Sequence, residues 1–382
     1  MKLENEVLKL TKKYVEQVIK PRAYELDESE EFPVDIIMEM GKYGLLGVLY
    51  PAEYGGLDMG MYSMIQVIKE LAKGSAAIAM TVVAHSILSG YPLFKFGSNY
   101  LKEKYLTGII SGQMIAAFTL TEESSGSDAL SLGTTAILTD EGYVLNGKKV
   151  FITNANFADV FIVAARTRND KMFGLTLFAV DRDAEGVSVS GRSEKKLGVR
   201  CSDTGELYLD NVLVPKEAII GKKNLGITAL NSTLCVARIG MAAIALGISL
   251  ECKQLSMEYV VNRKQFDQKI FNFQLIKEKI AQMELKTDIS ELMLSNVCSM
   301  FDRGENIQKQ ASETKLFSTD MVMGIAREAM QIFGAYGYSR DLPLERYYRD
   351  AKITEIGDGT SEIQKVIIAD EAIKRLKKDK YG

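Results

Sequence analysis

The chain has 382 residues, of which 47% are hydrophobic and 25% are charged, as in a globular protein of two or three compact units. Its formal net charge of −3 argues against a nucleic-acid-binding surface. No stretch reaches the roughly 18 consecutive apolar residues of a membrane span, and the start of the sequence does not resemble a signal peptide. We therefore expect a soluble, cytoplasmic protein with no nucleic-acid partner and no membrane partner.

The residue counts also narrow the chemistry. The chain has one histidine, His85, and four cysteines without CxxC spacing. Metal sites built from several histidines or from paired cysteines are therefore not expected. No GxSxG turn is present to host the serine of a hydrolytic triad. Catalysis by this chain would rely on carboxylates or on an organic cofactor.

Residues 1–115 are expected to form an N-terminal helical domain. Apolar side chains recur there at helical spacing, for example at Val34, Ile37 and Met38. Prolines and glycine turns divide this part into several helices rather than one.

Residues 116–225 change to short β-rich runs with turns about every ten positions, which favours a β-barrel or sandwich. Within them, Asn146-Gly147 is interpreted as the turn of a hairpin. Residues 226–382 are again helical, and the mostly apolar run 239–250 is interpreted as a buried core helix. The expected fold class is α+β, with an N-terminal helical domain, a middle β-barrel and a C-terminal four-helix-type bundle.

Neither of two common nucleotide-binding signatures is complete in this sequence. Gly142, Gly147 and Lys148 have P-loop spacing, but Lys149 stands where a serine or threonine should hold magnesium. The segment also lies within β-rich sequence rather than between a strand and a helix. No GxGxxG follows a predicted strand, so a Rossmann domain is not expected.

Four other segments suit ligand binding, although each also has an ordinary structural interpretation. Residues 118–128 join the helical and β parts and are rich in hydroxyl groups and small side chains. Residues 263–266, with Gln274 further on, could be a charged helix face with aromatic core contacts. Glycines in 331–338 indicate close approach of a helix or a ligand to the backbone. The fourth segment is 356–364.

This fourth segment contains Asp358 between two glycines. Structurally, Thr360 and Ser361 suit the start of a helix. Functionally, Asp358 would be a carboxylate held on an exposed tight turn with little around it, which suits proton abstraction.

The order of these segments is itself informative. Together with an earlier motif and two motifs of the middle part, they read in chain order GLLGVLYPAEYGG, FTLTEESSGSDA, KKVFITNA, LGVRCSDTGELYLDNVLVP, RKQF, QIFGAYGYSRDLPLERYYRDAKI and GDGTSEIQ. On these motifs the chain resembles the acyl-CoA dehydrogenase flavoprotein family over essentially its whole length, and most closely its short-chain, butyryl-CoA-dehydrogenase-like bacterial type. The resemblance implies a homotetramer that binds FAD between the β domain and the C-terminal bundle.

The resemblance also implies the residues that contact the cofactor. Those implied around the isoalloxazine ring and the ribityl chain are Phe118, Leu120, Thr121, Gly126, Ser127, Phe151 and Thr153. Those implied at the pyrophosphate and adenine of a neighbouring subunit's FAD are Arg263, Phe266 and Gln274, with Gln331, Gly334 and Ala335 nearby. Thr360 and Glu362 would also lie along the cofactor.

The implied reaction is α,β-dehydrogenation of an acyl-CoA. A carboxylate removes the α-proton, the flavin accepts the β-hydride, and electrons pass to an electron-transfer flavoprotein. The implied catalytic base is Asp358. Residues implied at the acyl-CoA are Ser127, Leu234, Arg238, Gly357 and Gly359.

The sequence departs from the family pattern at three positions. The usual base is a glutamate preceded by a tyrosine, whereas this chain has Gly357 and Asp358. A minority branch carries its glutamate at the position of Ala237 here. Aspartate shortens the reach by about 1.5 Å, and Gly357 should widen the pocket for a branched or cyclic acyl group. Phe151 replaces a tryptophan but keeps an aromatic ring against the flavin.

Three alternatives stay open at this point. The same site could run in reverse as an enoyl-CoA reductase. It could instead be an oxidase of nitroalkanes or of another carbon acid, with Asp358 as base and oxygen as acceptor. The chain could also be a non-catalytic scaffold subunit.

Overall fold

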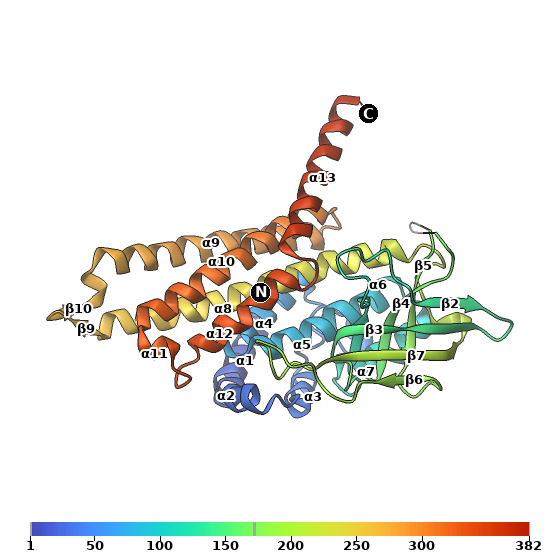
Figure 1. The fold of residues 1–382 in the computed structure, drawn as a ribbon, viewed down its shortest axis with the longest axis horizontal. Helices are drawn as coiled ribbons and strands as arrows, with labels where there is room; N and C mark the ends of the chain where they lie inside the picture. The colour runs from blue at the N-terminus through green and yellow to red at the C-terminus, as the bar shows by residue number, and fades with distance from the viewer. Residues whose placement is uncertain (1, 171–172, 382) are drawn as a thin grey trace.

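The computed structural model describes residues 2–170 and 173–381, and Figure 1 shows a β-sheet beside a body of packed helices. The N-terminal part is entirely helical. Its elements are α1 (Lys2–Tyr14), η1 (Val15–Ile19), α2 (Lys20–Ser29), α3 (Val34–Lys42), η2 (Ala52–Tyr54), α4 (Gly60–Gly74), α5 (Ala76–Val82), η3 (Val83–Gly90), α6 (Tyr91–Phe96) and α7 (Asn99–Ile110).

Helix α4 illustrates why this part folds as it does. Met61, Met64, Ile68 and Leu71 recur at three- and four-residue spacing, and all four are buried. This apolar face packs against a long C-terminal helix, α8 (Gly226–Asn262). The contact joins the two helical parts through a shared core.

The middle part is one mixed sheet of eight strands. They are β1 (Ala116–Thr119), β2 (Thr135–Leu138), β3 (Tyr143–Thr153), β4 (Val160–Arg166), β5 (Leu175–Asp181), β6 (Val187–Val189), β7 (Thr204–Val214) and β8 (Ile219–Ile220). A short turn, η4 (Lys216–Ala218), precedes β8. The strand order is β6-β7-β3-β2-β4-β5-β8, with β1 parallel to β4. The expected arrangement of helical terminal domains around a middle β domain is confirmed.

The predicted turn at Asn146-Gly147 is wrong. Strand β3 runs unbroken through both residues, with a shift of register against β7 at this point. A Cβ on Gly147 would lie 2.3 Å from Thr134 Oγ1, so the glycine permits close strand approach rather than a reversal. The hairpin turn lies a few residues earlier, where the Thr139 N–H donates to the Gly142 carbonyl at 2.7 Å.

The C-terminal part is a bundle around α8. After the β9 (Lys264–Gln265) and β10 (Gln268–Lys269) hairpin come η5 (Ile270–Asn272), α9 (Gln274–Asp302), α10 (Gln308–Phe333), α11 (Ala335–Tyr338), α12 (Leu344–Ile356) and α13 (Ser361–Tyr381). Helix α10 packs on α8, α9, α12 and α13. In Figure 1 most of α13 projects away from the body of the molecule.

Two helical stretches, Ala76–Phe96 and Gly226–Asn262, are long and apolar enough to cross a membrane by length and composition. In each, 89% of the most apolar window is buried inside the protein fold. Both are therefore core helices of this structure. The expected core helix at 239–250 is confirmed, since every residue from Ile239 to Ser249 is buried.

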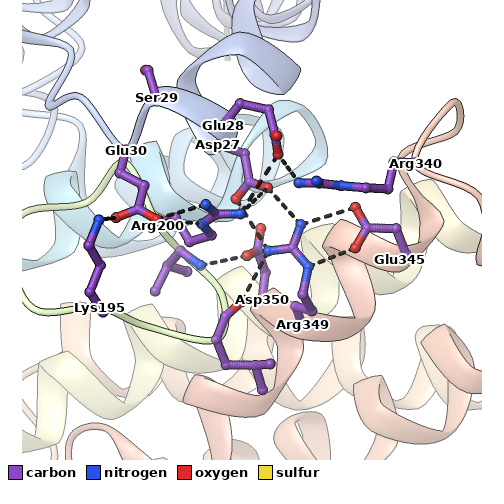
Figure 2. Close-up of polar contacts among 12 residues, drawn as sticks. Asp27, Glu28, Ser29, Glu30, Lys195, Arg200, Arg340, Glu345, Arg349 and Asp350 are labelled. Carbon is purple, nitrogen blue, oxygen red and sulfur yellow. Dashed lines mark hydrogen bonds and ion pairs between the residues drawn. The ribbon is translucent and has the colours of Figure 1, made fainter.

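A network of charged side chains ties the three parts together (Figure 2). Arg349 of α12 binds Asp27 of α2, with Nη2 and Oδ2 2.6 Å apart. Arg200, from the loop before β7, binds Glu30 at 2.7 Å. The buried Asp350 carboxylate accepts a backbone N–H of the same loop at 2.5 Å, and burial raises the pKa of Asp350 to about 6. These contacts set the sheet against both helical parts.

Candidate active site

Asp358 lies on the turn that connects α12 to α13. Asp358 and Gly359 follow one another in the left-handed region, with φ of +53° and +93°. Glycine adopts this conformation freely, whereas a residue with a Cβ pays about 1 kcal/mol for it. Thr360 ends the turn, and its hydroxyl accepts a first-turn N–H of α13 at 3.4 Å. The turn therefore fixes the direction of the Asp358 side chain.

The surroundings of Asp358 differ from the expected exposed turn with little around it. The residue is partly buried, and Lys315 of α10 and Arg238 of α8 act on its charge. Burial raises the pKa of Asp358, while the two cations oppose this rise. A carboxylate that is short of water yet held ionised by cations suits a proton acceptor.

Arg238 is nearly fully buried, with 7% of its surface exposed. Its Nη1 lies 3.7 Å from Cys235 Sγ, and its Nε has no hydrogen-bond partner within the described chain. Burial lowers the pKa of Arg238. Buried guanidinium donors nearly always find partners, so the unmatched donor indicates capacity to hold a ligand group beside Asp358.

A cavity of about 500 Å³ lies beside α8, with Cys235 in its wall. Tyr91 and Ser232 also line it, and their hydroxyls are 2.9 Å apart. Phe301 and Ile307 supply apolar walls. The volume and the mixed lining are typical of sites for small organic ligands.

The predicted flavin residues of the sheet lie on adjacent segments. Phe118 is buried at the end of β1, and the Thr121 carbonyl accepts the Val150 N–H of β3 at 2.9 Å. Phe151, next along β3, has φ of +55° at an irregularity in the pairing with β7, and its surface is 69% exposed. A strained backbone that presents an aromatic ring to solvent indicates a binding surface, and a flat ring such as a flavin fits it.

A buried ion pair underlies this surface. Lys149 is fully buried, and its Nζ donates to Glu122 Oε1 at 2.7 Å and to the Leu120 carbonyl at 3.2 Å. Burial lowers the pKa of Lys149 to about 8, against the influence of Glu122, which raises it. Glu122 also accepts from the Thr134 N–H and hydroxyl, at 3.0 and 2.6 Å. The pair holds the 118–122 segment against β3.

The other predicted residues near the site are variously placed. Gly126 and Ser127 are exposed in the loop between β1 and β2. Leu234 lies on α8 four residues before Arg238, and therefore on the same helix face. Glu362 is exposed in the first turn of α13.

Six residues predicted at the adenine end of the cofactor are exposed and lie at the end of the molecule opposite the sheet (Figure 1). They are Arg263, Phe266, Gln274, Gln331, Gly334 and Ala335. Phe266 is 88% exposed at the tip of the β9–β10 hairpin. One chain does not bring these residues together with those of the sheet. Their contact with a neighbouring subunit's FAD stays a prediction.

No sequence motif predicts a role for Lys315 or Gln364, although both are fully buried beside the Asp358 turn. The Gly359 carbonyl accepts from Lys315 Nζ at 2.6 Å and from Gln364 Nε2 at 2.8 Å. A lysine in an amphipathic helix is normally interpreted as a surface residue. The small neighbours Ala311 and Ser312 were the available signal that this face of α10 is tightly packed.

Comparison with known proteins places these features in a family. The chain matches the N-terminal, middle and C-terminal domains of acyl-CoA dehydrogenase over residues 2–113, 117–212 and 224–373. It is 39% identical to an acyl-CoA dehydrogenase of Bacillus subtilis over 362 residues, covering 94% of this chain and 95% of that protein. It is also 39% identical to a 3-(aryl)acrylate reductase of Clostridium sporogenes over 369 residues, covering 96% and 98%.

The fold has close structural counterparts as well. Butyryl-CoA dehydrogenase from Megasphaera elsdenii superposes with a TM-score of 0.95 at 34% identity, over 98% of each chain. Sequence, domain order and fold agree along the whole length. The chain belongs to the acyl-CoA dehydrogenase family, whose members are FAD-dependent oxidoreductases acting on CH–CH bonds of acyl-CoA substrates.

Proposed function

We propose that this chain dehydrogenates a short, branched or cyclic acyl-CoA at its α and β carbons, with Asp358 as the catalytic base. The observation that carries the proposal is the Asp358 carboxylate itself. It stands on a left-handed turn, partly buried, with the charges of Lys315 and Arg238 acting on it. A base so placed can take a proton from a carbon acid near neutral pH.

The reaction removes one proton and one hydride from the substrate. FAD, when bound, supplies the hydride acceptor. Asp358 takes the α-proton, and the loss of water around its carboxyl favours the protonated product. The Asp358 N–H makes no hydrogen bond within the described chain, so it is free to donate to the thioester oxygen as negative charge develops there.

The acyl group is proposed from the residue before the base. Gly357 has no side chain to limit the space beside Asp358. A Cβ at this position would lie 3.0 Å from Met241 Cε of α8, so the methionine occupies part of that space. Methionine is unbranched and flexible, and a turn of its side chain would open room for a branched or cyclic carbon skeleton.

The cavity beside Cys235 is proposed to receive the rest of the acyl-CoA. It starts one helical turn from Arg238, and its wall combines apolar side chains with hydroxyl, amide and charged ones. A pantetheine arm, with its alkyl segments and amides, matches such a lining.

We also propose a homotetramer that passes electrons to an electron-transfer flavoprotein. The two sets of predicted FAD residues stand at opposite ends of one chain, so a complete site would need a second copy. Helix α9 supports self-association, because Leu275, Leu285 and Leu292 leave 77%, 56% and 70% of their surfaces exposed.

The test is an anaerobic titration of the FAD-loaded protein, followed through the flavin absorbance band. Asp358→Asn should slow flavin reduction by about 10²–10⁴-fold while FAD stays bound. Unchanged reduction would show that Asp358 is not the base. Asp358→Glu should raise the rate with straight-chain butyryl-CoA if the shorter reach limits that substrate.

The acyl preference is tested with butyryl-, isobutyryl-, isovaleryl- and cyclohexanecarboxyl-CoA. Faster bleaching by a branched or cyclic thioester would support the proposed substrate class, and Gly357→Tyr should then abolish that preference. Bleaching by butyryl-CoA alone would support the proposed dehydrogenase activity and contradict the proposed preference for a branched or cyclic acyl group.

The reverse direction is a second candidate, favoured by the likeness to the Clostridium sporogenes reductase. The same Asp358 would then return a proton to the α-carbon of an enoyl-CoA. Reoxidation of pre-reduced enzyme by an enoyl-CoA, faster than reduction by the matching saturated thioester, would assign this direction.

A further inference from the structure

Lys315 of α10 is an unusual residue for a protein interior. Its side chain is fully buried, and no carboxylate lies within ion-pair distance of it among the described residues. Its Nζ donates instead to two backbone carbonyls, of Gly359 at 2.6 Å and of Glu355 at 3.5 Å. Burial of a charge without an ionic partner is costly, so its presence calls for a role.

Both carbonyls belong to the segment that carries Asp358. Glu355 lies in the last turn of α12, and Gly359 directly follows Asp358. Gln364 of α13 donates to the same Gly359 carbonyl at 2.8 Å. Side chains from two different helices thus converge on one oxygen, which fixes a turn whose two central residues are left-handed.

The two cations near Asp358, Arg238 and Lys315, have different surroundings. The charge of Arg238, on α8, acts on Asp358, and Arg238 has Cys235 as its neighbour. The charge of Lys315 acts on Asp358 from α10, and Lys315 in turn is influenced by Arg238, by Asp320 of its own helix and by Glu355 of α12. Lys315 has no carboxylate of its own to neutralise it, so its charge remains available to Asp358.

We propose that Lys315 is a positioning residue for Asp358, which holds the turn through the Gly359 carbonyl and keeps the carboxylate ionised in a site short of water. This inference rests on the proposed function, in which Asp358 is the base. The lysine contacts neither substrate nor reacting atoms. It acts on catalysis through the geometry and the ionisation of Asp358.

The test compares Lys315→Met, Lys315→Gln and Lys315→Arg with Lys352→Met in the FAD-loaded protein. Lys352 is a matched control, since it lies on α12 near the same turn, is 49% exposed and pairs with Glu355. Flavin reduction by butyryl-CoA, or by the thioester that bleaches it fastest, is followed from about pH 5.5 to about pH 9.

Removal of the charge should move the acid limb of the rate profile upward by about one to two pH units in Lys315→Met and Lys315→Gln. Lys315→Met should also lower the maximal rate by about 10- to 100-fold, because the turn loses a hydrogen bond. Lys315→Arg should keep the wild-type acid limb, and Lys352→Met should match wild type in both respects. If Lys315→Met yields no holoenzyme, Lys315→Gln carries the test, since it removes the charge and keeps a polar amide in the buried site.

A second readout needs no turnover. Asp358→Asn should raise the unfolding temperature more, or lower it less, in the Lys315→Met background than in the wild type, because there the carboxylate has lost its cation.

An acid limb that stays in place in both uncharged variants would overturn the inference, as would strictly additive effects of the two substitutions on stability. The proposed function fails separately, when Asp358→Asn leaves flavin reduction unchanged. If Asp358→Asn abolishes flavin reduction but the acid limb stays in place in Lys315→Met, the role of Lys315 is rejected and the role of Asp358 stands.

Discussion

Two fully buried lysines, Lys149 in the β domain and Lys315 in the C-terminal bundle, solve the same physical problem differently. Burial lowers the pKa of each to about 8. Lys149 is bound to its own carboxylate, Glu122, at 2.7 Å. Lys315 is held by backbone carbonyls. A lysine that is paired with a carboxylate cross-links two segments. A lysine without a carboxylate partner also acts through its charge on the groups around it.

The difference matches what each lysine supports. Lys149 holds the segment that ends at Glu122 against β3, beneath the exposed Phe151 ring. It keeps a binding surface in shape. Lys315 holds the turn of Asp358 through a backbone carbonyl. Because the lysine has no ion-pair partner among the described residues, its positive charge acts on the Asp358 carboxylate. Substitutions at the two lysines and at their partners should separate the structural contribution from that of charge.

The largest effect is expected from Lys149→Met. It leaves Glu122 buried without its cation and should lower the free energy of unfolding by about 3–5 kcal/mol. Loss of the contact with the Leu120 carbonyl should also weaken FAD retention, measured as flavin remaining after gel filtration. Lys148, the preceding residue, is exposed and pairs with Glu206, so Lys148→Met serves as the control and should change neither quantity. Equal losses in both variants would contradict a special role for the buried pair.

Breaking the same pair from the other side should cost somewhat less. Glu122→Gln keeps an oxygen acceptor for Lys149 and Thr134 but removes the negative charge, so we expect a loss of about 2–3 kcal/mol in urea unfolding. Without Glu122, which raises it, the pKa of Lys149 should fall below about 8. A Glu122→Gln variant as stable as wild type would show that hydrogen bonds alone carry this contact.

Stability should depend on pH through Lys315. Its pKa is 10.5 in the unfolded chain and about 8 when folded, so the folded protein binds fewer protons between these values. The stability contributed by Lys315 therefore rises as pH increases across this window. The wild type should gain about 1–3 kcal/mol relative to Lys315→Met between about pH 7.5 and about pH 10. A constant difference between the two proteins over this range would mean that the lysine is not buried as a cation.

The smallest effect is expected from Gln364→Met. The Gly359 carbonyl would keep Lys315 as its donor and lose only a neutral hydrogen bond, at a cost of about 1 kcal/mol. Because no charge is removed, the acid limb of the pH–rate profile should stay at its wild-type position. A shift as large as that expected for Lys315→Met would mean that turn geometry, rather than charge, controls Asp358.

The sequence by itself determined the family, the order of helical and β parts and the buried helix at 239–250. These features depend on local patterns and on motifs that can be recognised without the tertiary structure. The turn assigned to Asn146-Gly147 failed because the same dipeptide also serves where strands approach closely, and Thr134, which requires the glycine, is distant in sequence.

Only the tertiary structure decided what surrounds Asp358. Lys315 and Gln364 approach the turn from different helices, and Arg238 approaches from a third, 120 positions or so earlier in the chain. Sequence spacing carries no information about which helix faces meet in a bundle, because that depends on the packing of side chains along the whole of each helix. The burial that turns an ordinary lysine into a partner of the candidate base is a property of the folded molecule alone.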